Sequence, residues 1–504
     1  MAKATRTRRD DIVSRPGLET WHTQTKALYN QAVAFYFELY QAHPGLLDLD
    51  QQSALLQAEK LSHRTDRNPS PLWPLPETVN AAIPAMMRRA AINAARGAFK
   101  SFHSNYCRWQ KQKEKFEAKG KRFHHRPPVP PRVFNFNLPF YKGMFKDRTD
   151  TGVMVRLYSG TSWQWVKLWL VKRAEPIPAE WEAGCPVLVQ RRGRFRLHTP
   201  LEKKFKKPAK AVEQVAVDPQ LRVCAIDLNL GDAQAVCTIV QADGTEGATL
   251  FIRGGDFLHA RRKRLLGKVA IKRSQTGVLA EGEPDNKWLW DKIRAIEEDE
   301  AHRVSRRIVD FACEHGASIL VFEHLGKLKP VKGRYSKRSN DKRAYWLKGR
   351  IVKYARYKAW EHRILTCQVS PAFTSQDCSN CGHRPVARYA EGEAPLEYRP
   401  GGPLFLCPTC LKRGHADRNA SINIGFRFLI RSLEHLLLKP LSKDKGVGST
   451  QAREIVPQIQ HGRPHGLALP PLVFLAQLRL AGCGYAVGTG ESVYAGVPEE
   501  AAAL

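Results

Sequence analysis

The sequence has no long apolar run. No stretch approaches the roughly 18 to 20 uninterrupted apolar residues that a membrane-spanning helix requires. The first residues, Met-Ala-Lys-Ala-Thr-Arg-Thr-Arg-Arg, have no apolar core of the kind found in secretory signals. We therefore expect a cytoplasmic protein with no membrane partner. In a prokaryote, such a protein has direct access to the chromosome.

Acidic residues are scarce relative to basic ones. The 504 residues include 81 Lys and Arg against 48 Asp and Glu, which gives a formal net charge of +33. Such an excess favours a polyanionic partner, because binding to phosphates releases their condensed counterions. Composition alone also leaves open a soluble enzyme with basic solvated faces, or a ribosome-associated protein. With 43% hydrophobic residues the chain is able to bury sizeable cores, which excludes a wholly disordered protein.

The cysteines do not form a disulfide framework. There are 11, an odd number, and four of them stand in two C-x-x-C pairs: Cys378 with Cys381, and Cys407 with Cys410. This usage indicates a reducing compartment and one structural Zn²⁺ held by four thiolates. His383 lies close to the first pair, but four thiolates already fill a tetrahedral shell. A redox disulfide is the alternative for these pairs.

Helices are expected in the first part of the chain. Residues 1–17 predict a basic, flexible arm, and residues 18–126 predict a helical domain. From Leu18, apolar positions recur at alternating steps of four and three, which draws one stripe along a helix; these are Trp21, Thr25, Leu28, Ala32, Phe35 and Leu39. A second helix is expected over 78–118, and the proline-rich residues 126–131 mark a boundary.

A β-rich domain is expected next, over 127–215. Its segments 153–158, 163–170 and 186–199 carry β-branched and aromatic residues between turn signals, which predicts strands and a small barrel. The later part of the chain alternates strands with helices, which is typical of an α/β protein. Strands are expected near 222–229, 233–241, 247–253 and 318–322, and helices near 256–275, 286–315, 343–362 and from 418. Residues 439–504, rich in Gly and Pro apart from a possible helix at 469–481, predict a tail of no assigned function.

Three acids stand at the ends of apolar segments. Asp227 interrupts an apolar strand, Glu323 ends another, and Asp417 precedes the last helix, where Asn419 and Asn423 follow. Burying a lone carboxylate is costly, so each needs a partner, and Asp is also a common helix N-cap. Taken together, three converging carboxylates suit a pair of Mg²⁺ ions that hydrolyse a phosphodiester bond.

The motifs around these acids resemble those of a known family. Ala-Ile-Asp227-Leu, Leu-Val-Phe-Glu323-His-Leu and His-Ala-Asp417-Arg-Asn-Ala are similar to RuvC motifs I, II and III of the compact RNA-guided nucleases. These are the transposon-encoded TnpB proteins and the type V CRISPR effectors. The helical insertion between motifs I and II and the zinc ribbon before motif III are also similar. His415 departs from the pattern, since many relatives carry an Asp at that place; we expect it to form hydrogen bonds rather than bind metal.

The resemblance implies an RNase H-like (RuvC) nuclease domain with an inserted zinc ribbon, preceded by a helical recognition domain and a wedge domain. Residues 216–370 then carry motifs I and II, 371–414 the ribbon, and 415–438 motif III. It also implies two Mg²⁺ ions bound by Asp227, Glu323 and Asp417, a guide RNA, double-stranded target DNA and recognition of a short adjacent motif. The family label, transposon or CRISPR, and the choice between monomer and homodimer stay open.

Two basic clusters flank the proposed catalytic residues in the sequence. We expect them to bind the nucleic acid backbone, although charge runs are usually solvated faces. They are Arg261, Arg262, Lys263, Arg264, Lys268, Lys272 and Arg273, and then Arg334, Lys337, Arg338 and Arg350. Two other functions remain as alternatives: an RNA-guided DNA-binding protein that does not cleave efficiently, and a guide-independent nuclease such as a junction resolvase.

Overall fold

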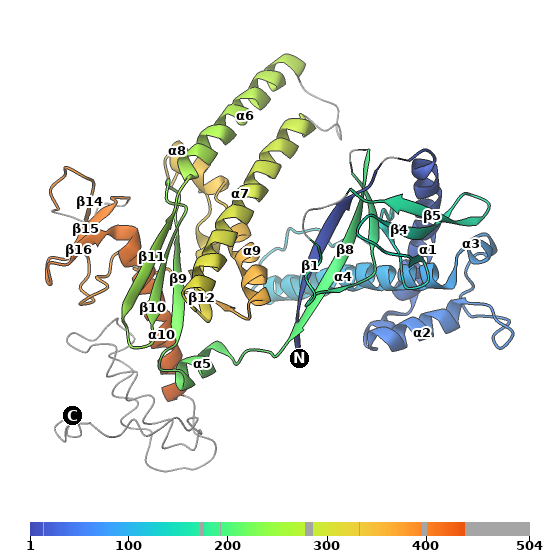
Figure 1. Ribbon diagram of the computed structural model, residues 1–504, viewed down its shortest axis with the longest axis horizontal. Coiled ribbons are helices and arrows are strands. Elements are labelled where there is room, and N and C mark those ends of the chain that lie inside the picture. Colours follow the sequence, from blue (N-terminus) through green and yellow to red (C-terminus); the bar gives the residue numbers. More distant parts are fainter. Residues whose placement is uncertain are drawn as a thin grey trace, which may run out of the picture. The chain divides into compact units, whose positions relative to one another are not determined.

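The protein is described by a computed structural model that covers residues 1–13, 15–171, 176–191, 193–277, 286–331, 333–395 and 401–438. It divides into two compact units (Figure 1). The N-terminal unit is Lys3–Phe205, and the C-terminal unit begins at Lys206. The expected tail 439–504, with its helix at 469–481, lies outside the described residues. No helix among the described residues is both long and apolar enough to cross a bilayer.

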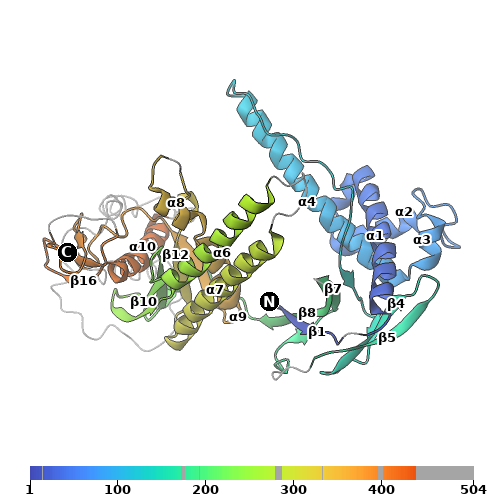
Figure 2. The ribbon, with the colours of Figure 1, turned by 90° about the horizontal axis from the view of Figure 1, so that it is seen from above.

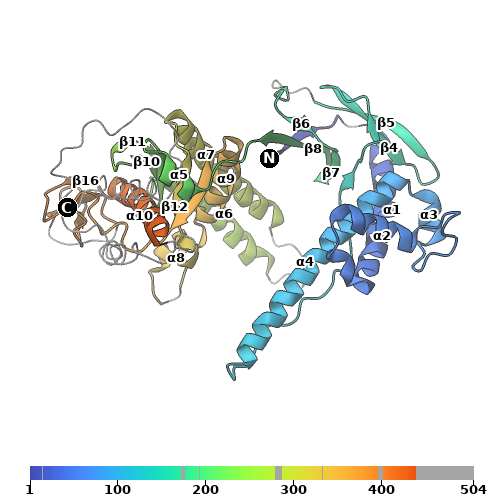
Figure 3. The same cartoon turned by 90° about the horizontal axis from the view of Figure 1, so that it is seen from below.

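The helices of the N-terminal unit pack around a stripe predicted from the sequence. Of its six positions, Thr25, Leu28, Ala32 and Leu39 are buried in α1. The single helix expected over 78–118 is wrong, because Ile83 is extended and Pro84 follows it. The longest helix, α4, continues beyond its contacts with α1 and α2 (Figures 2 and 3). The elements are α1 Leu18–Ala42, the 3₁₀ turn η1 Pro44–Leu47, α2 Gln51–Ser62, α3 Glu77–Ala82 and α4 Ala85–Glu117.

Two antiparallel sheets complete this unit. The strands expected at 153–158 and 163–170 are confirmed, whereas the segment 186–199 belongs to two strands, β7 and β8. One sheet contains β3 Phe145–Lys146, β4 Gly152–Tyr158 and β5 Trp163–Trp169. The other has the order β1-β8-β7-β2 with β6 beside β8, and an isolated bridge between Ile12 and Leu170 joins the two. The helices and both sheets share one apolar core. The second sheet comprises β1 Ala2–Asp11, β2 Leu138–Pro139, β6 Glu182–Ala183, β7 Val187–Arg191 and β8 Arg194–Phe205.

The basic arm expected at residues 1–17 is instead largely a strand, so that prediction is wrong. β1 pairs with β8, and alternate residues such as Ala4 and Asp10 are buried. The buried carboxylate of Asp10 accepts a hydrogen bond from Arg8 at 2.9 Å. The guanidinium of Arg6 lies 4.3 Å from the ring centre of Trp181. Arginines therefore pack along this strand, where the sequence predicted a basic, flexible arm.

The C-terminal unit is built on a five-stranded mixed sheet, which confirms the α/β class. Its order is β11-β10-β9-β12-β13. The strands β9 to β11 lie where strands were expected and form an antiparallel meander, while β12 runs parallel to both β9 and β13. The strands are β9 Arg222–Leu228, β10 Ala235–Gln241, β11 Glu246–Ile252, β12 Ile319–Glu323 and β13 Leu365–Val369.

Helices cover both faces of this sheet. α6, α7 and α9 pack on the face of Cys224 and Ile226, and α5 and α10 pack on the face of Val223 and Ala225. The helix expected at 343–362 begins later than predicted, because the chain leaves α8 at Ala344 and enters α9 only at Lys348. These elements are α5 Ala211–Val217, α6 Gly255–Thr276, α7 Lys287–Glu314, the 3₁₀ turn η2 Leu325–Lys327, α8 Lys337–Ala344, α9 Lys348–Glu361 and α10 Ala416–Leu438.

A glycine lets α10 approach the sheet closely. A Cβ added at Gly425 would lie 2.7 Å from Cγ2 of Val240 and 3.2 Å from Cβ of Ala225. Any side chain at this place would force α10 away from β9 and β10. One turn closer to the start of α10, the hydroxyl of Ser421 lies 2.6 Å from the hydroxyl of Thr238 on β10. The start of α10 is therefore held at a fixed position over the sheet.

Candidate active site and zinc ribbon

The sheet register places Asp227 and Glu323 next to each other. In the parallel pair β9–β12, Ile226 is opposite Phe322, so the next residues along the two strands are Asp227 and Glu323. Side chains alternate along a strand, and both acids fall on the face covered by α10. Both are nearly buried, with 6% and 8% of their surface exposed. Two carboxylates therefore share one edge of the sheet, as expected from the sequence.

Asp417 is the third acid, in the first turn of α10. Burial raises the pKa of Asp227 well above its usual value, and the negative charges of Glu323 and Asp417 raise it further. A hydrogen bond from the side-chain amide of Asn229, at 3.1 Å, and the charge of Arg388 act in the opposite direction. The electrostatic influence of both acids on Asp227 shows that the structure brings the three predicted residues together.

Glu323 is held by a residue of the loop that leads to the cysteines. The hydroxyl of Thr374 donates a hydrogen bond to the Glu323 carboxylate. Burial raises the pKa of Glu323, while this hydrogen bond and the positive charge of Arg427 oppose the rise. Thr374 lies on the loop between β13 and the first cysteine pair. Its structural role is to orient the second acid.

Arg388 is a residue of the site that the sequence did not reveal. It lies on β14 Ala387–Tyr389 of the ribbon, and its guanidinium is 2.7 Å from the carboxylate of Asp417. Its Nε donates to the carbonyl of Gly402 at 2.5 Å. Both partners of the ion pair are largely buried, at 11% and 14% exposure. A single arginine between the two cysteine pairs carries no sequence signal, since only the folding of the ribbon brings it to the acid.

The start of α10 is also tied to the ribbon by polar side chains. His415 Nδ1 accepts a hydrogen bond from the backbone N–H of Asp417 at 3.2 Å, as expected for a hydrogen-bonding role. Asn419 accepts from the N–H of Ser379 at 2.8 Å and donates to the carbonyl of Asp377 at 2.7 Å. Asn423 also donates to that carbonyl, at 2.7 Å. The asparagine pair therefore fixes the first cysteine knuckle against the helix that carries the third acid.

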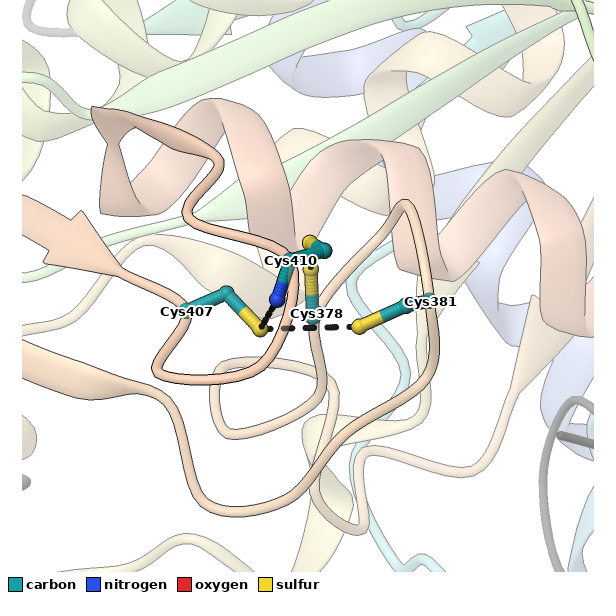
Figure 4. A group of neighbouring side chains, drawn as sticks. All are labelled: Cys378, Cys381, Cys407 and Cys410. Carbon is teal, nitrogen blue, oxygen red and sulfur yellow. Dashed lines mark hydrogen bonds between the residues drawn. The ribbon is translucent and has the colours of Figure 1, made fainter.

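The four cysteines form a preorganised metal site (Figure 4). All four sulfurs lie within 4.8 Å of one another, and the cysteines are free. Cys378 and Cys410 are 3.6 Å apart at sulfur, and Cys381 and Cys407 are 3.5 Å apart. A disulfide requires about 2.05 Å, whereas four sulfurs about 2.3 Å from a tetrahedral Zn²⁺ are roughly 3.8 Å apart. The geometry fits zinc and disfavours the redox disulfide.

A small sheet supports the two knuckles. Its order is β14-β15-β16, with β15 at Leu404–Leu406 and β16 at Arg413–His415. Cys407 and Cys410 lie in the turn between β15 and β16, and Phe405 is buried beside the cysteines. Lys412 connects this hairpin to the main sheet through an ion pair with Glu246 at 2.6 Å. The ribbon is therefore a separate small core that is joined to the five-stranded sheet.

The carboxylates are arranged differently from the thiolates. Within the described part of the chain, the cysteines are the only group of three or more potential ligands whose donor atoms all lie within 4.8 Å. The three acids therefore spread more widely, which suits ions that keep water and substrate oxygens as ligands. Three carboxylates stand against two arginines, Arg388 and Arg427, so acidic groups are in excess. That donor set fits divalent hard cations.

Most of the basic residues expected on α6 are exposed, but Arg262 is not. Arg262 is 6% exposed, pairs with Glu297 of α7 at 3.0 Å, and lies 4.9 Å from the ring centre of Tyr345. It therefore packs between helices, which contradicts its expected place on a nucleic acid surface. Arg350 also pairs with Glu297, at 3.1 Å. The expected basic residues that are exposed on α6 are Arg261, Lys263, Arg264, Lys268, Lys272 and Arg273.

The reason for the burial of Arg262 is the periodicity of α6. Leu258, Arg262, Leu265 and Val269 recur on one face, and Leu265 and Val269 pack on Leu289 and Ile293 of α7. In the second basic cluster, Arg334 and Lys337 are exposed. The side chain of Arg338 lies outside the described residues. The expected positive charge is therefore present on the side of α6 away from α7, and at Arg334 and Lys337.

Models of two families match the chain. The Aq_aa04 family model matches residues 6–159, and the Cas12f1-like TNB domain model matches residues 349–424. The chain is 32% identical over 240 residues to the TnpB-like protein aq_aa05 of Aquifex aeolicus (strain VF5), which covers 45% of this chain and 73% of that relative.

More distant relatives carry functional names. The chain is 27% identical over 217 residues to the CRISPR-associated endodeoxyribonuclease Cas12f1 of Sulfoacidibacillus thermotolerans, which covers 41% of this chain and 47% of that protein. It therefore spans about half the length of that relative. Among solved structures, the Cas12f1–sgRNA–target DNA complex is 16% identical with a TM-score of 0.31, and covers 83% of this chain and 98% of the other. The mini-RNA-guided endonuclease CRISPR-Cas_phi3 is 10% identical with a TM-score of 0.48, covering 84% and 92%.

Proposed function

This chain belongs to the family of TnpB-like proteins, and from that premise we propose that it is an RNA-guided endonuclease that hydrolyses phosphodiester bonds in DNA. The observation that carries the proposal is the shared edge of β9 and β12, where Asp227 and Glu323 are neighbours and Asp417 is close enough to raise the pKa of Asp227. Residues 216–370 and 415–438 then form the RuvC nuclease domain, and 371–414 form its zinc ribbon.

The three carboxylates would hold two Mg²⁺ ions. When bound, the ions supply an activated water and stabilise the leaving oxygen of the scissile bond. Asn229 and Thr374 orient Asp227 and Glu323 through the hydrogen bonds described above. Arg388 fixes the carboxylate of Asp417. No nucleophilic side chain is needed, because water attacks the phosphate.

The proposal that an RNA guides this protein to its target is based on its relatives. The relative from Sulfoacidibacillus thermotolerans is named an endodeoxyribonuclease, and the solved Cas12f1 complex contains sgRNA and target DNA. We extend these partners to this chain: a guide RNA, and a DNA duplex recognised beside a short motif. The net charge of +33 and the exposed basic face of α6 favour such polyanions. Protein contacts of this kind bind the backbone, while base pairing selects the sequence.

The test is to purify the protein, sequence the RNA that accompanies it, and assay that complex on plasmids carrying the matching target. We expect one discrete RNA species and cleavage that requires both the RNA and Mg²⁺. A preparation free of discrete RNA that still cuts DNA would refute guidance.

The ion pair between Arg388 and Asp417 favours a second candidate function, an RNA-guided DNA-binding protein that does not cut. Specific binding of the target without cleavage would support it.

A further inference from the structure

The outer face of the sheet β3-β4-β5 carries a row of aromatic side chains. Along β5, Val166 and Leu168 point into the core and are 2% and 1% exposed. The alternate residues, Trp163, Trp165, Lys167 and Trp169, therefore lie on the opposite face. Trp165 is 39% exposed and Trp169 is 48% exposed. Two large indole rings are thus open to solvent, on a sheet whose other face packs Val166 and Leu168 into the core.

Cations accompany both exposed rings. The ammonium of Lys146 lies 4.7 Å from the ring centre of Trp165, and that of Lys167 lies 3.8 Å from the ring centre of Trp169. Arg156 of β4 is directly opposite Trp165 in the register. The three strands contain no Asp or Glu. This face therefore combines exposed π surface with positive charge alone.

Contacts at both ends of β5 hold this row of aromatic residues in place. Trp163 anchors one end of the row, since its Nε1 donates to the carbonyl of Ala82 at 2.6 Å and its ring packs on Tyr158 at 5.4 Å. At the other end, Gly152 is opposite Trp169. A Cβ at Gly152 would lie 3.6 Å from Cε of Lys167 and 3.8 Å from the ring of Trp169. The nearest atom to such a Cβ would be the carbonyl oxygen of Leu168, at 3.0 Å, so β4 and β5 approach closely at this end of the row.

We propose that this face is a binding site for single-stranded nucleic acid. Unpaired bases stack on Trp165 and Trp169, and the phosphates between them pair with Lys146, Arg156 and Lys167. The two rings are four residues apart on one strand, about 13 Å, so different nucleotides contact them. A duplex does not fit this chemistry, because its bases are already stacked on each other and present no free π face. The positive charge without acids favours a polyanion over an ordinary apolar protein partner.

The first experiment measures affinity in the full-length protein. The probes are a fluorescein-labelled 12-nucleotide single strand and the matching duplex, at about 0.3 M salt to weaken sequence-independent phosphate binding elsewhere. Trp165→Ala and Trp169→Ala are each expected to weaken single-strand binding about 5- to 150-fold and to leave duplex binding unchanged. Leu72→Ala is the matched control, since Leu72 is 74% exposed in the same unit.

Conservative variants separate stacking from apolar contact. Trp169→Tyr keeps a π face and should retain most of the affinity, whereas Trp169→Leu keeps an apolar surface and should not. Equal melting temperatures for all variants establish that the fold is intact. Full affinity in Trp169→Leu, or an equal loss for single strand and duplex, would overturn the proposal.

A second experiment locates the contact. A single strand containing 5-iodouracil is photo-cross-linked to the full-length protein, and the modified peptides are identified by mass spectrometry. Cross-links at Trp165 or Trp169 are expected, and cross-links confined to other peptides would contradict the proposal. The outcome does not depend on nuclease activity, so protein with Asp227→Asn should give the same cross-links. Failure of guided cleavage therefore leaves this inference untouched.

Discussion

The two candidate metal sites of the C-terminal unit differ in how the chain builds them. In the ribbon, each pair of donors comes from one short turn, and all four sulfurs are within 4.8 Å of one another. The acids come from three segments about a hundred residues apart, and they meet only through strand register and the position of α10. The thiolate site is a closed cage set by local sequence. The carboxylate site is open and depends on the whole fold.

The four-cysteine site and the carboxylate site are connected by contacts of the ribbon. The loop before Cys378 supplies Thr374 to Glu323, and the carbonyl of Asp377 accepts hydrogen bonds from Asn419 and Asn423 of α10. Arg388 of the ribbon then reaches Asp417. A metal with a purely structural role in the ribbon is therefore positioned to control the geometry of the third acid.

Removing a carboxylate should have the largest effect on cleavage. Glu323→Gln keeps the size of the side chain but removes a charge that the Mg²⁺ ions require. We expect guided plasmid cleavage to fall by at least about 10³-fold, with target binding unchanged in a gel-shift assay. The control is Asp66→Asn, because Asp66 is exposed in the N-terminal unit. Near-normal cleavage by Glu323→Gln would show that the open site is not catalytic.

Breaking the closed site should have a smaller effect on cleavage. Cys407→Ser should lose one equivalent of zinc and make the ribbon sensitive to proteolysis, because the site contributes directly to folding. Cleavage should fall roughly 10- to 100-fold, the usual cost of disturbing residues that orient metal ligands. Cys313→Ser is the control, since Cys313 is exposed on α7. Loss of zinc with full cleavage activity in Cys407→Ser would show that the two sites are independent, and full zinc content would show that Cys407 is not a ligand.

Arg388→Ala tests the connection itself. The change leaves both sets of ligands intact but removes the ion pair that fixes Asp417, so we expect cleavage to fall about 10-fold with zinc content unchanged. Arg413→Ala is the matched control, because Arg413 is exposed on the same small sheet. If cleavage rises in Arg388→Ala, the arginine restrains the enzyme instead of positioning the acid.

The smallest expected effect is on stability without Mg²⁺. Asp227 and Glu323 have raised pKa values in the folded protein, so the folded state holds protons that the unfolded state has released. Their contribution to stability is therefore present at low pH and is lost as pH rises through the raised values. At neutral pH, Asp227→Asn should raise the melting temperature by roughly 2–4 °C in Mg²⁺-free buffer without a chelator, a condition that leaves the ribbon zinc in place. A lower melting temperature would contradict electrostatic repulsion between Asp227 and the carboxylates of Glu323 and Asp417.

Local patterns predicted much of this fold from the sequence. Cysteine spacing predicted the ribbon, apolar runs predicted the strands of the main sheet, and acids in or at the ends of those runs predicted the candidate site. Where the prediction failed, contacts distant in sequence decide. β1 forms because β8 is available for pairing, and Arg262 is buried because Glu297 of another helix neutralises it. Arg388 has no pattern of its own, since its role exists only once the ribbon lies against α10.

The most direct test of the account is a calorimetric Mg²⁺ titration of the protein bound to guide RNA and a target with a non-hydrolysable scissile bond. If the three acids form a two-metal site, the wild-type complex binds two ions. Asp227→Asn should lose at least one of them, and Asp66→Asn should match the wild type. Identical Mg²⁺ binding by Asp227→Asn and the wild type would contradict the assignment of these carboxylates.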